Sequence, residues 1–510
     1  MDIFQGLFSG FAVALTGTNL LYCFIGSLLG TAVGVLPGLG PAATISLLLP
    51  VVYAMGSPAT SIIFLAGIYY GAMYGGSTTS ILMRIPGEAA SVVTCIDGYE
   101  MAKKGRAGAA LGIAAIGSFI AGTVGVIGMT FMAPPLAEFA LRFGAPEYFA
   151  LMLFGLMLAV FLSGDSPIKG TIMLLMGIIF ANVGLDPISG QERFTFGIVS
   201  LQGGFDFVTL AMGLFGLSEI LLTLEEQEGA QFVTRTIGKL FPTAADWAES
   251  KWPVFRGSVL GFFTGIIPGG CAVVASLTSY AVEKRFSKHP EEFGKGALAG
   301  VAGPESANNG ASSSSFIPLL TLGIPCNASV AMIFAALLIQ GVTPGPFLIQ
   351  ERPDVFWGVI ASMYVGNVIL LILNLPLVGL WVQLLKVPFG ILGPVIAMFT
   401  TVGCYSLANE TFSIYVFIGF GVLGYVLRKL KFEPGPMVMS FILAPLIENA
   451  FRQSLLMSEG SLWIFVSRPI SGTLMAIFAI VLVGQLISTY RRQKRNACGS
   501  EGVEKSAGQE

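Results

Sequence analysis

Charged residues are scarce in this sequence, and their scarcity decides its class. Only 11% of the 510 residues are Asp, Glu, Lys or Arg, whereas an ordinary soluble domain carries about 25%. No charged residue and no histidine occurs in four long stretches, which are 3–83, 107–137, 257–282 and 306–350. Because a bilayer core selects uncharged segments of about 20 residues, we expect an integral membrane protein that crosses the bilayer many times.

Other absences exclude whole classes of function. The net charge of −2 excludes a nucleic-acid binder, which needs clustered basic residues. The six cysteines form no C-x-x-C pair, and we expect them to be buried packing residues rather than a disulfide framework. The single histidine, His289, lies in a charged loop, and neither a zinc-protease H-E-x-x-H motif nor a nucleotide-binding G-x-x-x-x-G-K-[ST] motif occurs. We therefore expect neither enzyme activity nor a resident cofactor or metal.

The apolar segments predict an all-α polytopic membrane protein with about ten to twelve transmembrane segments. Several of these segments are short or are interrupted by Gly and Pro, so we expect broken helices and re-entrant hairpins. Basic residues follow the last span at 491–495 and form a short loop at 428–431, two spans earlier. The positive-inside rule then places the C-terminus in the cytoplasm.

Two parts of the chain resemble each other. One set of matches shares a shift of 231 positions (261 − 30), and it pairs Gly30 with Gly261, Gly34 with Gly265, Pro37 with Pro268 and Gly38 with Gly269. In a second match, 75–80 followed by Ile85-Pro86 resembles 310–315 followed by Ile324-Pro325. We therefore predict two repeated halves, and the expected parts are a first half-repeat at 1–225, a charged connecting loop at 226–256, a second half-repeat at 257–490 and a polar cytoplasmic tail at 491–510.

Interrupted helices at matching places in two halves indicate the binding site of a secondary transporter. Backbone groups that a break frees need protein or cavity water around them, and helix N-termini favour carboxylates. The alternative is helix packing, because Gly and Ser are common where membrane helices meet. The residues that we expect to bind substrate are Gly38, Gly76, Ser77, Thr78, Thr79, Gly269, Asn308, Asn309, Ser312 and Ser313.

Glu305 is the most suggestive ionisable residue, because 45 uncharged residues follow it. An acid at membrane depth indicates function by default, here as a cation ligand or proton carrier. The alternative is an interfacial carboxylate at the mouth of a hairpin. Backbone carbonyls near the breaks at Pro37, Pro268 and Pro325 are further candidates for coordinating a coupling cation.

Several motifs resemble the large membrane subunit of tripartite tricarboxylate transporters, the TctA-like proteins. In the first half they are Gly34-Val-Leu-Pro-Gly-Leu-Gly-Pro41, Tyr74-Gly-Gly-Ser-Thr-Thr79, Pro86-Gly-Glu88 and Asp97-Gly-Tyr99. In the second half they are Tyr280-Ala-Val-Glu-Lys284, Phe293-Gly-Lys-Gly296, Gly303-Pro-Glu-Ser-Ala-Asn-Asn309, Leu322-Gly-Ile-Pro325 and Pro344-Gly-Pro346. The resemblance covers roughly residues 15–490.

This resemblance implies a permease of the bacterial inner membrane that takes up citrate-like di- or tricarboxylates, driven by a Na⁺ or proton gradient. It implies two partners, a small four-helix membrane subunit and a periplasmic solute-binding protein. Where the family pattern has Gly and a small residue after Ile-Pro, this chain has Cys326-Asn327. We therefore add Asn327 as a substrate-binding candidate and expect a substrate preference that differs from citrate.

Two other interpretations stay open at this point. One is a channel or an exchanger that needs no binding protein. The other is a membrane enzyme or a sensor subunit. An enzyme needs a nucleophile–base pair or a metal site, which we cannot assemble here, and a sensor needs a signalling domain, for which no soluble segment is long enough.

Overall fold

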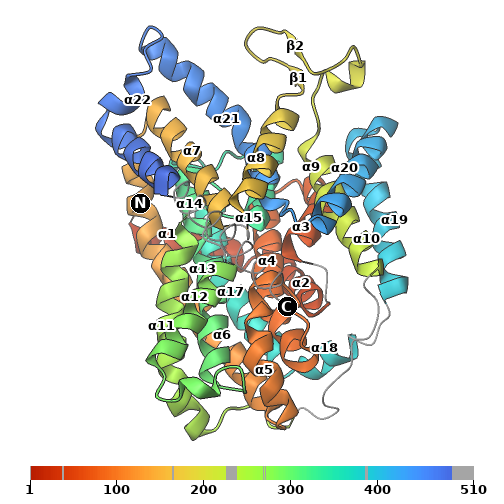
Figure 1. Ribbon diagram of the computed structural model, residues 1–510, viewed down its shortest axis with the longest axis vertical. Coiled ribbons are helices and arrows are strands. Elements are labelled where there is room, and N and C mark those ends of the chain that lie inside the picture. The colour runs from red at the N-terminus through yellow and green to blue at the C-terminus, as the bar shows by residue number, and fades with distance from the viewer. Residues whose placement is uncertain are drawn as a thin grey trace, which may run out of the picture. The chain divides into compact units, whose positions relative to one another are not determined.

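The computed structural model describes residues 2–36, 40–162, 166–225, 238–267, 269, 272–384 and 389–484. Most of these residues are helical (Figure 1). The first ten α-helices are α1 Ile3–Ala14, α2 Gly17–Val35, α3 Pro41–Ala54, α4 Pro58–Met83, α5 Thr94–Lys103, α6 Ala107–Ala140, α7 Ala145–Leu162, α8 Pro167–Ala181, α9 Phe207–Ala211 and α10 Ser218–Glu225. The later ones are α11 Ala244–Ile266, α12 Ala272–Phe286, α13 Ala299–Ser314, α14 Phe316–Leu322, α15 Ala328–Ile339, α16 Leu348–Glu351, α17 Pro353–Asn374, α18 Val378–Leu384, α19 Phe389–Ala408, α20 Thr411–Lys429, α21 Gly435–Met457 and α22 Ile464–Ser467.

A further apolar helix, Pro469–Gly484, lies near the end of the described chain, which also contains several short elements. Three are 3₁₀ turns, η1 Ala89–Val92, η2 Val199–Leu201 and η4 Pro290–Glu292, and η3 Met212–Leu217 is a π-helical stretch that joins α9 to α10. Strands β1 Gly184–Leu185 and β2 Glu192–Arg193 form one small antiparallel pair.

The prediction of an all-α, multi-pass membrane protein is confirmed. In the described ranges, five helical runs of at least 18 residues are long and apolar enough to cross a membrane, and they are Gly17–Val35, Ala107–Ala140, Phe207–Glu225, Pro353–Asn374 and Thr411–Lys429. Shorter apolar helices accompany them, among them α3 and α15. The expected number of about ten to twelve spans stays a prediction.

The chain divides into two compact units. One consists of Met1–Arg142 and Leu158–Ala444, and the other consists of Phe143–Met157 and Pro445–Glu510. Within the second unit, Arg468 Nε donates to the buried Glu147 Oε1 at 2.6 Å. The candidate site lies entirely in the first unit, which the following paragraphs describe.

Glycines let two pairs of helices in the first unit approach closely. A Cβ added at Gly30 of α2 would lie 2.4 Å from the carbonyl oxygen of Ile68 in α4. A Cβ added at Gly261 of α11 would lie 2.2 Å from the carbonyl oxygen of Ala307 in α13. Small residues allow such backbone contact between membrane helices. The glycine patterns of α2 and α11 therefore hold α4 and α13, the two helices that carry most of the predicted site residues.

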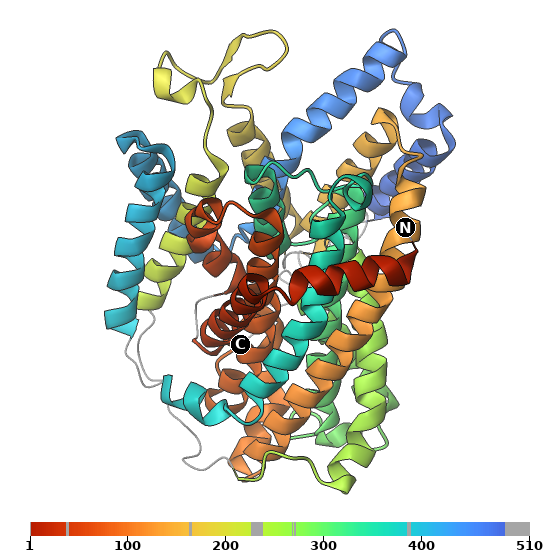
Figure 2. The same ribbon diagram turned by 180° about the vertical axis from the view of Figure 1, so that it is seen from behind.

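The N-terminal helix α1 packs across α17 in the same way (Figure 2). A Cβ at Gly6 would lie 2.3 Å from the Trp357 ring, and a Cβ at Gly10 would lie 2.2 Å from the Trp357 carbonyl oxygen. The large, buried Trp357 therefore fits only because α1 presents glycines to it.

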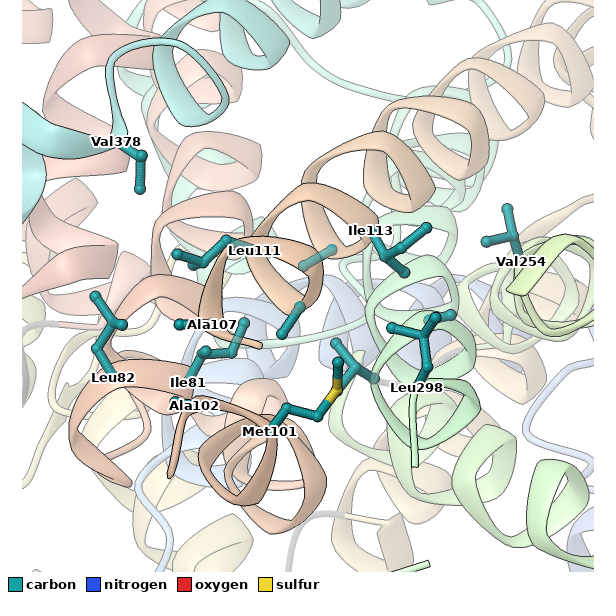
Figure 3. Close-up of a cluster of buried hydrophobic side chains, with 14 residues drawn as sticks. Ile81, Leu82, Met101, Ala102, Ala107, Leu111, Ile113, Val254, Leu298 and Val378 are labelled. Atoms are coloured by element: carbon teal, nitrogen blue, oxygen red, sulfur yellow. The ribbon is translucent and has the colours of Figure 1, made fainter. Parts of the chain in front are cut away.

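A buried apolar cluster fixes α5 beneath the end of α4 (Figure 3). Ile81 of α4 and Met101 of α5 lie in this cluster with Leu111 of α6 and Val254 of α11. Leu298, at the start of α13, completes it. The cluster joins elements from distant parts of the sequence and so positions the segment between α4 and α5, which contains η1.

Candidate functional site

Two helices of the first unit end in the same way. Arg84 follows α4 with φ of 60°, and Gly323 follows α14 with φ of 68°, so both lie in the left-handed region that terminates helices. An Ile-Pro pair comes next at each place, and Pro325 belongs to the second one. Since proline cannot donate a backbone hydrogen bond, neither helix continues through it.

A polar cap then starts a new helical segment after each break. Glu88 Oε2 accepts from the Ala90 N–H at 2.6 Å, at the start of η1. Asn327 Oδ1 accepts from the Val330 N–H at 3.0 Å, at the start of α15. Each break therefore presents the N-terminus of a helical segment, capped by an acid in one case and by an amide in the other.

A cavity of about 530 Å³ lies where these starts meet two other helix N-termini. The residues that line it at the four starts are Pro41, Ala42 and Ala43 of α3, Glu88, Ala89 and Ala90 at η1, Ala272, Val273 and Val274 of α12, and Asn327, Ala328 and Ser329 at α15. Helices α3, α4 and α15 pack against one another beside it (Figure 1).

The first N–H groups of a helix have no partner in that helix, and they carry partial positive charge. No side chain caps α3, whose preceding residue is Gly40. Three helices of 12 to 15 residues, α3, α12 and α15, thus have their N-terminal residues in the lining of one cavity of ligand size. This arrangement suits an anion with more than one carboxylate.

Charged side chains from α20 and its surroundings also line the cavity. Arg428 forms an ion pair with Glu219 of α10, and its guanidinium lies 5.9 Å from the centre of the Phe215 ring. Glu433 lines the cavity as well. Arg428 is the cavity's one basic side chain among the residues that the structure describes, so it is the side chain there that could pair with an anionic group.

Two hydrogen bonds link the breaks to distant helices. Asn327 Nδ2 donates to the Tyr69 hydroxyl of α4 at 3.0 Å, and both residues line the cavity. Asn308 Nδ2 of α13 donates to Glu88 Oε1 at 3.2 Å. The Asn327 cap of α15 is therefore held by α4, which lies earlier in the chain, and the Glu88 cap of η1 is held by α13, which lies later.

The predicted site residues differ in where they lie relative to the cavity. Gly269 and Asn327 line the cavity, and the Gly269 N–H donates to the Cys326 carbonyl at 2.9 Å. Gly76 of α4 lies behind Glu88, since a Cβ added there would come within 2.8 Å of Glu88 Cγ. Asn308 reaches the cavity only through Glu88. The predictions that fall outside the described residues are Pro37, Gly38 and Pro268.

The remaining hydroxyl candidates are buried inside α4 and α13 rather than at a helix break. Ser77 Oγ donates to the Tyr74 carbonyl at 2.8 Å, and Ser312 and Ser313 donate to the Asn309 carbonyl at 3.1 and 3.0 Å. The others of this kind, buried in α4, are Thr78 and Thr79. The helix breaks lie further along the chain, at 84 and 323, so these serines and threonines lie before the breaks and within helix.

Asn309 and Glu305 are fully buried on α13. Asn309 Nδ2 donates to Ser118 Oγ of α6 at 2.7 Å. Thr94 of α5 donates to Glu305 Oε1. In the described structure, Glu305 Oε2 and the side-chain oxygens of Asn308 and Asn309 have no hydrogen-bond partner.

Sequence reasoning missed Glu88, Tyr69 and Arg428. Arg428 was assigned to a cytoplasmic basic loop because its neighbours are basic, but it is the penultimate residue of α20 and faces the cavity. A signal for Glu88 exists in the sequence, since Pro86-Gly-Glu88 follows the first break as Pro325-Cys-Asn327 follows the second.

Comparison with known proteins identifies the family of this chain. The family model described as the tripartite tricarboxylate transporter TctA family matches residues 20–439. The chain belongs to the TctA family. Family membership makes it a membrane subunit of a tricarboxylate transporter rather than an enzyme, and one that works with other components of the tripartite system. The resemblance seen in the motifs is thereby confirmed.

Two relatives of this TctA-family chain come from Agrobacterium vitis. An uncharacterized 52.8 kDa protein in the TAR-I ttuC' 3' region is 49% identical over 494 residues, which cover 97% of this chain and 98% of the relative. An uncharacterized protein in the TAR-II ttuC' 3' region is 48% identical over 234 residues, covering 46% of this chain and 97% of the relative. No solved structure matches the chain.

Proposed function

We propose that this chain is the permease subunit of a secondary-active uptake system for citrate-like di- and tricarboxylates, and that the 530 Å³ cavity is its substrate site. The observation that carries the proposal is the meeting of helix N-termini from α3, α12 and α15 beside Arg428. Backbone N–H groups at helix N-termini hold carboxylates without adding a buried charge. Arg428 supplies the one strong, charge-assisted contact.

A duplication supports this assignment. The first residues of α3 and α12, Pro41 and Ala272, differ by 231 positions (272 − 41), the shift of the glycine pattern. The first residues of η1 and α15, Ala89 and Ala328, differ by 239 (328 − 89). We infer two half-repeats, each of which contributes one pair of helix starts to the cavity, in re-entrant hairpins of the kind that transporters use.

The contacts support a different register from the one that the serine-rich segments suggested. Gly30 of α2 contacts Ile68 of α4, and Gly261 of α11 contacts Ala307 of α13. The two contacted residues, on α4 and α13, therefore differ by 239 positions (307 − 68). The same shift relates Arg84 to Gly323 without any insertion. In this register 75–80 corresponds to 314–319 rather than to 310–315.

Ion coupling is the second part of the proposal. Carrying a multiply charged anion across a bilayer requires compensating cations, and Na⁺ or protons from an imposed gradient supply both charge and driving force. Glu305 is the buried acid that we assign to this role, with backbone carbonyls near Pro325 and the other breaks as further ligands.

The motif resemblance supports the remaining assignments. We infer a small four-helix membrane subunit and a periplasmic solute-binding protein as partners, a bacterial inner membrane as the location, and a cytoplasmic C-terminus.

Uptake of labelled citrate into vesicles tests the proposal. The chain is assayed alone and with both partners, with and without a Na⁺ or proton gradient. Uptake that needs all components and one gradient supports a tripartite symporter. If the chain takes up citrate without its partners, and neither gradient changes the rate of uptake, the protein is a channel or an exchanger instead.

A further inference from the structure

Three buried side-chain oxygen atoms on α13 accept no hydrogen bond in the described structure, and they are Glu305 Oε2, Asn308 Oδ1 and Asn309 Oδ1. The first two belong to side chains that are 1% and 0% exposed and that contact the same segment of the first half. Leaving a buried polar atom without a partner is unfavourable, and more so when the group is charged. The two residues are three apart on one helix, so their side chains are neighbours on its surface.

Both side chains reach the same short segment of the first half. Thr94 donates to Glu305 Oε1, and Glu88 accepts from Asn308 Nδ2 at 3.2 Å. Glu88, Glu305 and Asn308 are thus connected by contacts between α13 and the 88–94 segment, and the unpartnered atoms of Glu305 and Asn308 are both acceptors.

Other ionisable groups on the elements around α13 already have partners or lie elsewhere. Asp97 of α5 accepts from the Tyr280 hydroxyl of α12 at 2.9 Å and from three backbone N–H groups at 2.7 to 2.9 Å. Glu283 of α12 pairs with Arg256 of α11. Cys95 of α5 is a buried thiol. Helices α4 and α14 contain no Asp, Glu, Lys or Arg, but Arg84 follows α4 directly, and the acid of α6 lies at its far end, position 138. In the described structure no basic side chain forms an ion pair with Glu305, whose Oε1 is bonded by Thr94 and whose Oε2 has no partner.

A cation bound between Glu305 Oε2 and Asn308 Oδ1 would give both acceptors a partner. We propose that a monovalent cation binds between Glu305 and Asn308, and that Glu88 connects this cation site to the substrate cavity. The proposal deepens the function proposed above and rests on it. The proposed ligands are one acid and one amide, which together carry at most one negative charge.

The link to the cavity runs through one amide. A cation at Asn308 Oδ1 fixes that side chain with its Nδ2 directed at Glu88, which lines the cavity. The cation also offsets the negative charge that Glu88 and Glu305 present to an anionic substrate. Substrate affinity therefore rises when the cation is bound, and by reciprocity cation affinity rises with substrate present.

The repeat provides an internal comparison. Under the shift of 239, Asn308 corresponds to Tyr69 (308 − 69) and Glu88 corresponds to Asn327 (327 − 88). The matching contact is Asn327 with Tyr69, which contains no acid. The cation site is therefore expected on the Glu88 side alone.

Thermal unfolding of the purified full-length chain tests the site without requiring transport. Wild-type protein is titrated with NaCl against choline chloride at pH 8, and separately with acid in the absence of Na⁺. Stabilisation by Na⁺ identifies a sodium site, and stabilisation by acid alone identifies a proton site. We expect Glu305→Gln and Asn308→Ala to raise the half-saturating Na⁺ concentration at least tenfold, or to abolish the acid-induced rise in Tm.

Asn374→Ala is the matched control, because Asn374 is also buried with an unpartnered side-chain oxygen, but lies at the end of α17 outside the cavity lining. It should respond to cations as wild type does. A cation response that survives in both Glu305→Gln and Asn308→Ala overturns the site, as does a wild-type protein that no cation stabilises.

Gradient-driven citrate uptake by the assembled transporter separates the two proposals. If wild-type uptake follows a gradient while both variants keep their cation response, only the cation site is wrong. If no gradient drives uptake by the wild type, the proposed function fails as well.

Discussion

Arg428 offers a direct test of where substrate carboxylates bind. Its partner Glu219 is only 15% exposed, so removing the arginine alone leaves a mostly buried acid without its counter-charge. Breaking a fully buried pair costs about 3–5 kcal/mol, which would obscure any effect on binding. The perturbation is therefore a cycle of Glu219→Gln, Arg428→Gln and the double variant, in which the glutamines keep nearly the same size.

The magnitude follows from the contact that a substrate carboxylate would make. A hydrogen bond to a charged group contributes about 1.5–3 kcal/mol, and each 1.4 kcal/mol is a tenfold change in affinity. The double variant should therefore bind citrate roughly 10- to 100-fold more weakly than Glu219→Gln alone. Glu219→Gln itself should bind at least as tightly as wild type, because the substrate no longer competes with an acid for Arg428.

Equilibrium binding of labelled citrate to the purified transporter, at fixed Na⁺ and pH, measures these affinities. The control is Arg352→Gln with Asp354→Asn, an ion pair at 2.8 Å at the start of α17, outside the cavity lining. Equal affinities for Glu219→Gln and the double variant would show that Arg428 does not contact substrate and would refute the placement of the site.

Three further outcomes follow from the packing and the caps. Gly261→Leu should lower the yield of monodisperse protein and destabilise it by at least about 1–3 kcal/mol through overpacking against α13, whereas Gly17→Leu, which meets nothing within 4 Å, should be neutral. Gly323→Ala should cost about 1–2 kcal/mol, seen as a lower Tm, because the left-handed φ of 68° disfavours a Cβ. Asn327→Ala should weaken citrate binding at least about tenfold, the value of one lost polar contact of ~1.4 kcal/mol, while Asn309→Ala should leave it within about twofold because Asn309 lies outside the cavity lining.

The membrane fold was predictable because lipid imposes a strong and local constraint on composition. Uncharged runs and Gly/Pro interruptions are visible in the sequence without knowledge of contacts, and they led correctly to an all-α, multi-pass chain. The positions of the breaks were not predictable in the same way. Gly75 to Ser80 has the composition of a loop, yet in a membrane the same residues pack helices, and α4 continues through them to Met83.

The site was partly predictable for a related reason. Gly269 and Asn327 stand out because each lies next to a proline break. Arg428 does not stand out, since its direction depends on the rotation of α20 about its axis, and the sequence shows only a basic cluster at the end of an apolar helix. Glu88 escaped notice because its burial comes from Gly76 and Asn308, residues that only the fold brings to it.

The caps at the two breaks differ in charge. If the proposed half-repeats and carboxylate substrate are correct, each half supplies helix starts to the same cavity, and a substrate with several carboxylates would gain contacts from both. Asn327 contributes an amide to one end, whereas Glu88 places an acid at the other. Under the proposed function, an anion would meet repulsion from Glu88 until a cation neutralises that acid. Binding of the substrate would then depend on the cation, and such dependence is the physical requirement for a symporter that does not leak either solute.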